Sequence, residues 1–60
     1  MWVIRKNGKI FNLANVNMLK WDGRATTIMI GQSWWILSEN NVLSKICDAL
    51  RRGDNYVEVD

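Results

Sequence analysis

The stretch Gly31–Asn40, GQSWWILSEN, decides the fold because it holds a tight turn, a strand and the approach to a helix. A two-residue turn with glycine first, as in Gly31-Gln32, is typical of a type II′ β-hairpin. The following run, Ser33–Leu37, is rich in aromatic and β-branched residues and predicts a strand. Side chains alternate between the two faces of a strand, so we expect Trp34 and Trp35 on opposite faces.

Two more turn signals lie N-terminal to this stretch. Asn7-Gly8 and Asp22-Gly23 favour two-residue type I′ hairpin turns. The join at Ala14-Asn15 allows a tight turn, a bulge or a wider loop. The predicted strands are Trp2–Lys6, Lys9–Leu13, Val16–Trp21, Arg24–Ile30 and Ser33–Leu37.

C-terminal to the stretch, the apolar period changes from two residues to 3.6, which predicts an amphipathic helix. Ser38 or Asn40 is the predicted N-cap, and Gly53 is placed as the left-handed residue that ends the helix. A short strand, Tyr56–Val59, follows. The apolar arc of the helix comprises Val42, Leu43, Ile46, Cys47, Ala49 and Leu50.

These elements predict one α+β domain over residues 1–60, a five-stranded antiparallel meander packed on one C-terminal helix, with a short final strand. Two-residue turns fix the register, so the residues that share a face can be written down. We expect the helix to cover one face as the core. That face carries Trp2, Ile4, Phe11, Leu13, Val16, Met18, Met29, Trp34 and Ile36.

The opposite face of the predicted meander also carries large apolar side chains, and no element remains to cover them. Monomers rarely expose an apolar patch larger than a few hundred Å². We therefore expect a partner or oligomer interface here, with Trp34 in the core and Trp35 in the interface. On this prediction Trp34→Ala unfolds the chain, and Trp35→Ala weakens assembly alone. The predicted interface residues are Leu19, Trp21, Ile28, Ile30, Trp35 and Leu37.

The size of the chain supports the same expectation. A domain of 60 residues hides only about 60 % of the surface of its unfolded chain and usually needs a staple or a partner. The sequence has one cysteine, no histidine and no metal-ligand spacing, so oligomerisation is the expected remedy. No signal peptide and no apolar run of about 18 residues is present, which together with the single cysteine favours a cytoplasmic protein that does not enter a membrane.

No combination of residues predicts catalysis. The carboxylates have no nucleophile, general base or phosphate-binding loop beside them, and each glycine is assigned to a turn or a cap. Cys47 lies on the apolar arc of the helix and is expected to pack as a small hydrophobic residue. We therefore predict a protein that is not an enzyme, with no catalytic residue, no cofactor and no metal.

Five of the eight basic residues are expected at one end of the meander, where two hairpin tips meet. Such a cluster can contact phosphates, with Trp21 as a platform for an unpaired base. Charged hairpin tips also keep sheets soluble, and we favour that simpler interpretation. The candidate anion or nucleic-acid contacts are Arg5, Lys6, Lys9, Lys20 and Arg24.

The segment Gly8–Gly23, GKIFNLANVNMLKWDG, resembles short, mostly uncharacterised bacterial and phage proteins. In these proteins an N-L-x-N-V segment leads into a strand, further strands and a closing helix. The motif corresponds here to Asn12, Leu13, Asn15 and Val16. The resemblance implies a bacterial or phage source and a protein that acts by binding, inhibiting or assembling with something larger. It implies no catalytic residue.

Three functions follow from the sequence. The first is a non-enzymatic module that binds another protein or forms a homo-oligomer through its apolar, tryptophan-containing face. The second is a small nucleic-acid-binding regulatory protein that uses the basic hairpin tips. The third is a small-ligand-binding protein with a pocket between subunits.

Overall fold

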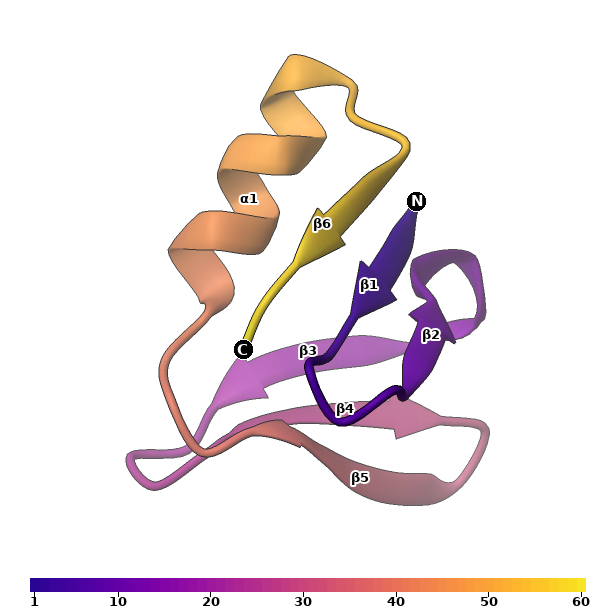
Figure 1. The fold of residues 1–60 in the computed structure, drawn as a ribbon. Coiled ribbons are helices and arrows are strands. Elements are labelled where there is room, and N and C mark those ends of the chain that lie inside the picture. The colour runs from indigo at the N-terminus through magenta and orange to yellow at the C-terminus, as the bar shows by residue number, and fades with distance from the viewer.

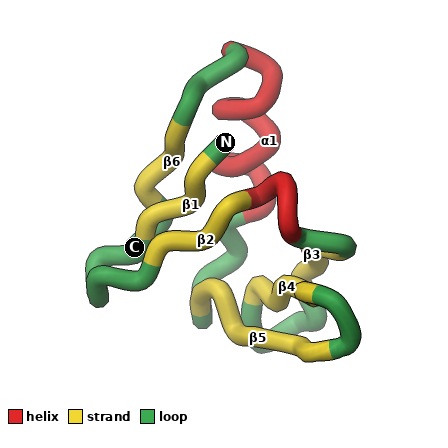
Figure 2. Tube along the Cα trace, turned by 90° about the vertical axis from the view of Figure 1, so that its right-hand side faces the viewer, coloured by secondary structure: helices red, strands yellow, loops and turns green.

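The computed structural model describes all 60 residues and shows two three-stranded sheets and one helix (Figure 1). The predicted α+β class is confirmed, but the single five-stranded meander is wrong. The elements are β1 (Trp2–Ile4), β2 (Ile10–Asn12), β3 (Met18–Trp21), β4 (Thr26–Ile30), β5 (Ser33–Ser38), α1 (Leu43–Arg52) and β6 (Tyr56–Glu58). Figure 2 shows the two sheets as separate layers, with the helix at one side of both.

The first sheet has the strand order β2-β1-β6 and joins the two ends of the chain. β1 pairs antiparallel with β2 and parallel with β6. The N–H of Trp2 donates to the carbonyl of Asn55 (2.9 Å), and the N–H of Val59 donates to the carbonyl of Ile4 (2.9 Å). The final strand predicted from the sequence therefore exists, and its partner is the first strand.

The second sheet, β3-β4-β5, is a local antiparallel meander. The predicted pairing of β4 with β5 is confirmed, with Met29 opposite Trp34 and Thr27 opposite Ile36. β3 is shifted by two residues from the predicted register, so that Met18 lies opposite Met29. A shift of two keeps every side chain on its predicted face, because the side-chain period of a strand is two.

The β3–β4 turn explains that shift. Its central residues are Gly23 and Arg24, one position later than predicted, and Gly23 has a φ of +94°. The Asp22 carboxylate accepts from the N–H groups of Arg24 (2.8 Å) and Ala25 (2.9 Å). Aspartate side chains commonly bond to amides two residues ahead in this way, which takes Asp22 out of the turn centre.

The first hairpin has a three-residue loop instead of the predicted two-residue turn. The N–H of Arg5 donates to the carbonyl of Lys9, and the N–H of Gly8 donates to the carbonyl of Arg5. Gly8 has a φ of +88°. This matches a type I turn followed by a left-handed glycine, which adds one residue to the loop. Val3 therefore lies opposite Phe11, where the two-residue turn predicted Ile4.

A turn of 3-10 helix at Leu13–Asn15 separates the two sheets. The Asn12 side chain accepts from the N–H of Ala14 (3.1 Å), and the N–H of Val16 donates to the carbonyl of Leu13 (3.1 Å). A 3-10 turn takes the chain out of the extended conformation, so β2 and β3 do not pair. Of the alternatives at Ala14-Asn15, the wider connection is present, and it allows the first sheet to fold over the second.

Helix α1 is shorter at its start than predicted. Its N-cap is Val42, which makes no side-chain cap bond, so the prediction of Ser38 or Asn40 as the cap is wrong. The predicted end is confirmed, because Gly53 is left-handed and donates to the carbonyls of Ala49 and Leu50. Arg51 and Arg52 lie in the last turn, where positive charge is favourable at the end of a helix dipole.

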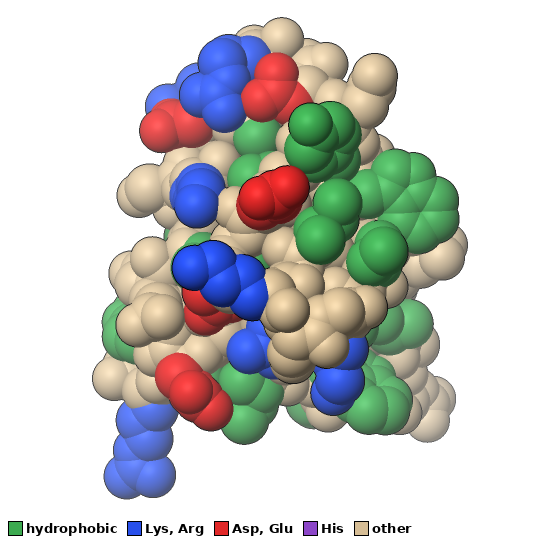
Figure 3. Space-filling model, viewed as in Figure 1, with side chains coloured by type: hydrophobic (Ala, Val, Ile, Leu, Met, Phe, Trp, Pro, Cys, Tyr) green, Lys and Arg blue, Asp and Glu red, His purple; other side chains and the backbone are tan.

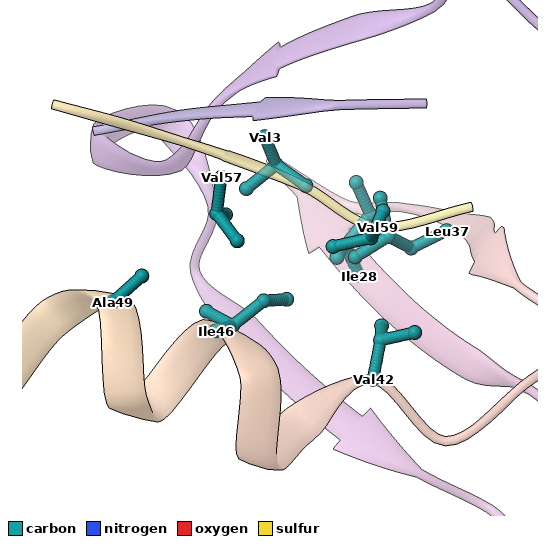
Figure 4. Packing of buried hydrophobic residues seen from close by; sticks show 8 residues of the cluster. All are labelled: Val3, Ile28, Leu37, Val42, Ile46, Ala49, Val57 and Val59. Carbon is teal, nitrogen blue, oxygen red and sulfur yellow. The ribbon is translucent and has the colours of Figure 1, made fainter. Parts of the chain in front are cut away.

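The core lies between the two sheets and the helix. Figure 4 shows helix side chains pointing toward the first sheet and toward the inner face of the second sheet. The buried cluster comprises Val3, Ile28, Leu37, Val42, Ile46, Ala49, Val57 and Val59. Four strands (β1, β4, β5 and β6) contribute one of these side chains each, and the helix contributes two. Such a small core is expected for a chain of this length.

The predicted core face is wrong for the second sheet. Trp34 is 48 % exposed and Ile36 is 55 % exposed, whereas Ile28 and Leu37 are each 1 % exposed. In the first sheet, Trp2 is also exposed and its neighbour Val3 is buried. The reversal arises because the first sheet, and not the helix alone, covers the inner face of the second sheet.

Candidate protein-binding surface

The structure divides the predicted interface residues into three groups. Ile28 and Leu37 are buried, so the prediction that they lie on an uncovered face is wrong. Leu19, Trp21 and Ile30 are partly buried on the same inner side. Trp35 alone of the set is strongly exposed, at 51 %. These residues share a face as predicted, but that face points toward the rest of the chain.

Trp35 is exposed because it lies on the edge strand of the second sheet, directly opposite Ile28. Beside it is an open groove with a volume of about 440 Å³. The first and second sheets both contribute to this groove. The groove therefore lies at the boundary of the area in which the first sheet covers the inner face of the second sheet. The groove is lined by Lys9, Ile10, Phe11, Ile30 and Trp35.

The outer face of the second sheet points away from the core and has no covering element. Two rows of side chains cross its three strands. One row is Met18, Met29 and Trp34, and the other is Lys20, Thr27 and Ile36. We define these six residues as the outer face. Their large apolar members were assigned to the core by the sequence, so sequence reasoning missed them as surface residues.

Lys20 and Trp34 contact each other across the outer face. The Lys20 Nζ lies 4.7 Å from the centroid of the Trp34 ring, although the two residues belong to the two edge strands. An ammonium group within about 6 Å of an indole face is attracted to the ring electrons. The contact holds both long side chains over β4 and places one positive charge beside the apolar row.

Thr27 introduces an unpaired polar atom into this face. Its Oγ1 is inaccessible to solvent and has no hydrogen-bond partner within the chain. A buried hydroxyl without a partner costs free energy that a paired one does not. The middle of the outer face therefore has a hydroxyl that neighbouring atoms shield from water and that no group of the chain pairs.

The first sheet also has an apolar outer face, but polar side chains interrupt it. Trp2 and Tyr56 are neighbours on adjacent strands, and both are exposed. Asn12 lies beside Trp2, and Glu58 lies beside Ile4. In Figure 3 hydrophobic side chains gather beside β1 and β6, and charged side chains of both signs are scattered over the rest of this view.

The predicted basic cluster is split between the two sheets. Arg5, Lys6 and Lys9 belong to the β1–β2 hairpin, and Lys20 and Arg24 belong to the β3–β4 hairpin. Arg5 forms an ion pair with Asp60, with 3.6 Å between its Nε and the carboxylate. The charge of Lys20 is directed over Trp34.

Asp60 connects the end of the chain to the end of β5. Its carboxylate accepts from the Ser38 hydroxyl and from the Asn40 amide (3.3 Å). The bond from Ser38 is the main cause of a lowered pKa for Asp60, and Asn40 and Arg5 lower the pKa further, although partial burial opposes them. These contacts fasten the region after β6 to the second sheet.

The remaining reactive side chains do not form a catalytic or metal-binding site. Cys47 is exposed, so the prediction that it packs in the core is wrong; the buried helix residues near it are Ile46 and Ala49. No group of three or more histidine, cysteine, aspartate or glutamate side chains is gathered to hold a metal ion. The helix is too short and too polar to cross a membrane.

Comparisons of the chain with protein-family models, with curated proteins and with solved structures found no match.

Proposed function

We propose that this protein is a small non-enzymatic module that binds another protein through the outer face of its second sheet. The observation that supports this proposal is the exposure of Met18, Trp34 and Ile36 on one continuous face of a hydrogen-bonded sheet. Tryptophan is among the residues that most often dominate protein interfaces, and methionine adapts to differently shaped partners.

The chemistry of the outer face indicates what kind of partner fits it. An apolar partner surface covers the Met18–Met29–Trp34 row. A carboxylate at the rim of that surface meets Lys20. This surface takes the place of the predicted interface, whose members Ile28 and Leu37 are buried.

The experiment compares the proteins captured from a bacterial lysate by the immobilised wild type and by two variants. Trp34→Gln and Met18→Gln each place a polar side chain on the outer face, one on β5 and one on β3. We expect both variants to lose the proteins that the wild type retains. Circular dichroism and urea unfolding establish that each variant is folded before capture.

Tyr56→Gln is the matched control, because Tyr56 is an exposed aromatic residue on the outer face of the first sheet. It is expected to capture the same proteins as the wild type. Loss of capture with Tyr56→Gln but not with Trp34→Gln would assign binding to the first sheet. Equal capture by all folded variants would likewise contradict the proposal.

A second candidate function is binding of single-stranded nucleic acid in the groove. The observation that favours it is that Lys9 borders the same hollow as Phe11 and Trp35. Aromatic rings stack on bases, and a lysine contacts the phosphate, so affinity should fall as salt rises. A gel-shift titration with a single-stranded oligonucleotide at two salt concentrations tests it. The absence of a shift at low salt, or an unchanged shift with Lys9→Gln, would remove this candidate.

A further inference from the structure

Strand β5 forms one edge of the second sheet. Figures 1 and 2 both show β5 at the margin of the molecule, with no segment beyond it. Its residues Ser33–Ile36 are all exposed. The opposite edge of the sheet, β3, is contacted by helix α1. β5 is also the longest strand of the chain, with six residues.

The pairing pattern shows which backbone groups of β4 point toward β5. The N–H of Asp22 donates to the carbonyl of Ala25, so these residues form a hydrogen-bonded pair of the β3–β4 ladder. Backbone groups in a strand point alternately to its two sides. Counting along β4 in steps of two, Thr27 and Met29 bond to β3, and Ile28 therefore bonds to β5.

The same alternation leaves free groups on β5. Ile28 lies opposite Trp35, so Trp35 directs its N–H and carbonyl toward β4. Its neighbours Trp34 and Ile36 then direct theirs outward. No turn, loop or side chain of the chain bonds to these four outward groups. The edge of β5 therefore presents two residues, Trp34 and Ile36, whose free N–H and carbonyl groups can pair with another strand.

We propose that β5 pairs antiparallel with β5 of a second copy of this chain, giving a dimer with one continuous six-stranded sheet. A two-fold axis uses the same edge on both copies, so the contact is closed at two chains. The strand order becomes β3-β4-β5-β5-β4-β3. The outer edges of this sheet are the two β3 strands, each contacted by its own helix.

One register pairs all the free groups. Trp34 lies opposite the partner's Ile36, and Ile36 lies opposite the partner's Trp34. These two pairs make four hydrogen bonds across the axis. Trp35 then lies directly opposite the partner's Trp35 as a non-hydrogen-bonded pair, in which side chains approach most closely.

The composition of β5 favours a second copy as the occupant. Exposed edge strands that must stay unpaired usually carry lysine, proline or an inward charge. β5 has the sequence SWWILS, with no charge and no proline, so two copies meet without like-charge repulsion. The groove beside Trp35 leaves space next to the axis for the partner's indole.

The size of the contact indicates the protein concentrations at which the dimer should form. Stable complexes bury about 800 Å² per partner, and the whole chain has only 4216 Å² of accessible surface. Pairing along the exposed part of one strand gives a contact at the lower end of interface sizes. We expect a micromolar dissociation constant, so sedimentation is measured from about 1 to about 500 μM. The mass should rise from 7.0 kDa toward twice that value.

Backbone N-methylation tests the edge without changing any side chain, since a 60-residue chain is accessible to chemical synthesis. N-methylation of Ile36 removes an outward donor and places a methyl group in the contact, so the dissociation constant should rise by about 100-fold or more. N-methylation of Asn12 is the matched control. Asn12 lies on the edge strand β2, beside the hydrogen-bonded pair of Val3 and Phe11, and its N–H also points outward.

Disulfide trapping tests the register. In a Cys47→Ser background, Trp35→Cys should form a disulfide between two copies, because non-hydrogen-bonded pairs have Cα atoms about 4.5 Å apart. Ser33→Cys should not, since it lies opposite the partner's Leu37. A wild type that stays monomeric, or an N-methyl-Ile36 chain that dimerises like the wild type, overturns the proposal. Neither result would contradict the proposed function, because Met18 and the outer face bind another protein independently of this dimer.

Discussion

The two faces of the second sheet are alike in sequence and opposite in their surroundings. Ile28 on the inner face and Met29 on the outer face are neighbours in β4, both apolar, yet only Ile28 is fully buried. The inner face is covered by the first sheet and the helix, whereas the outer face has no cover. An apolar side chain thus enters the core only where another element is available to cover it, and the uncovered face becomes the candidate surface for binding.

The largest expected effect comes from truncating neighbouring residues on the two faces. Ile28→Ala should lower the free energy of unfolding by about 2–5 kcal/mol, because a fully buried side chain leaves a cavity. That loss approaches the total stability of a small domain, about 5 kcal/mol at the low end. Met29→Ala should cost clearly less. Urea unfolding of both variants measures the difference, and equal losses would contradict the assignment of the two faces.

The two threonines of β4 extend the comparison to hydroxyl groups. Thr26 is buried; its Oγ1 donates to the carbonyl of Asn40 (2.7 Å) and accepts from the N–H of Val42 (3.1 Å). Thr26→Val leaves both groups without this partner and should cost about 1–3 kcal/mol. Thr27→Val removes a hydroxyl that has no partner and should be close to neutral. Thermal unfolding of this isosteric pair checks the prediction, which fails if Thr27→Val is the more damaging.

Acid should lower the free energy of unfolding by weakening the contacts of the Asp60 carboxylate. Its pKa is lowered in the folded chain mainly by the hydrogen bond from Ser38, so the folded state binds fewer protons at this group than the unfolded state. The resulting stability is complete above the ordinary aspartate pKa of about 3.9 and is lost as the pH falls through the lower folded value. Unfolding measured from neutral pH downward should show this loss in the wild type.

Asp60→Asn should flatten that pH profile. Asp22 contributes in the same direction, because the amides of Ala25 and Arg24 lower its pKa. The double variant Asp60→Asn with Asp22→Asn should therefore be flatter than either single variant. If the free energy of unfolding of Asp60→Asn falls with pH as steeply as that of the wild type, the bonds from Ser38 and Asn40 do not stabilise the fold.

The smallest expected effect is on the outer face. Lys20→Gln removes the ammonium group from Trp34, and a contact of this kind at an exposed site contributes about 0.5–1 kcal/mol. Tryptophan fluorescence should change, since the charge beside one indole is lost. Lys45→Gln, on the exposed side of the helix, is the control and should leave both stability and fluorescence unchanged. Matching effects of the two variants would show that the contact is not maintained in solution.

Signals from residues close in sequence predicted the strands and the helix. They could not predict the pairing of strands that are distant in sequence. The turn at Gly31–Gln32, the β4–β5 register and the end of α1 at Gly53 all depend on residues close in sequence. The pairing of β1 with β6 joins residues more than 50 positions apart. No periodicity within either strand specifies such a partner, so the first sheet could not be derived.

The candidate site was misplaced for the same reason. The alternation of side chains correctly separated Trp34 from Trp35 and kept Ile28 and Leu37 on one face. Which face is covered depends on where the first sheet lies. The 3-10 turn after Asn12 allows the first sheet to fold over the second, and the hydrophobic pattern of the strands does not reveal it.

By itself the sequence determined the strands, the helix and the two sets of side chains that alternate across the second sheet. The tertiary structure alone decided which set is buried, because burial requires a covering layer, and that layer is built by pairing the two ends of the chain. Periodicity of two residues divides a strand into two faces but contains no information on which of them meets water.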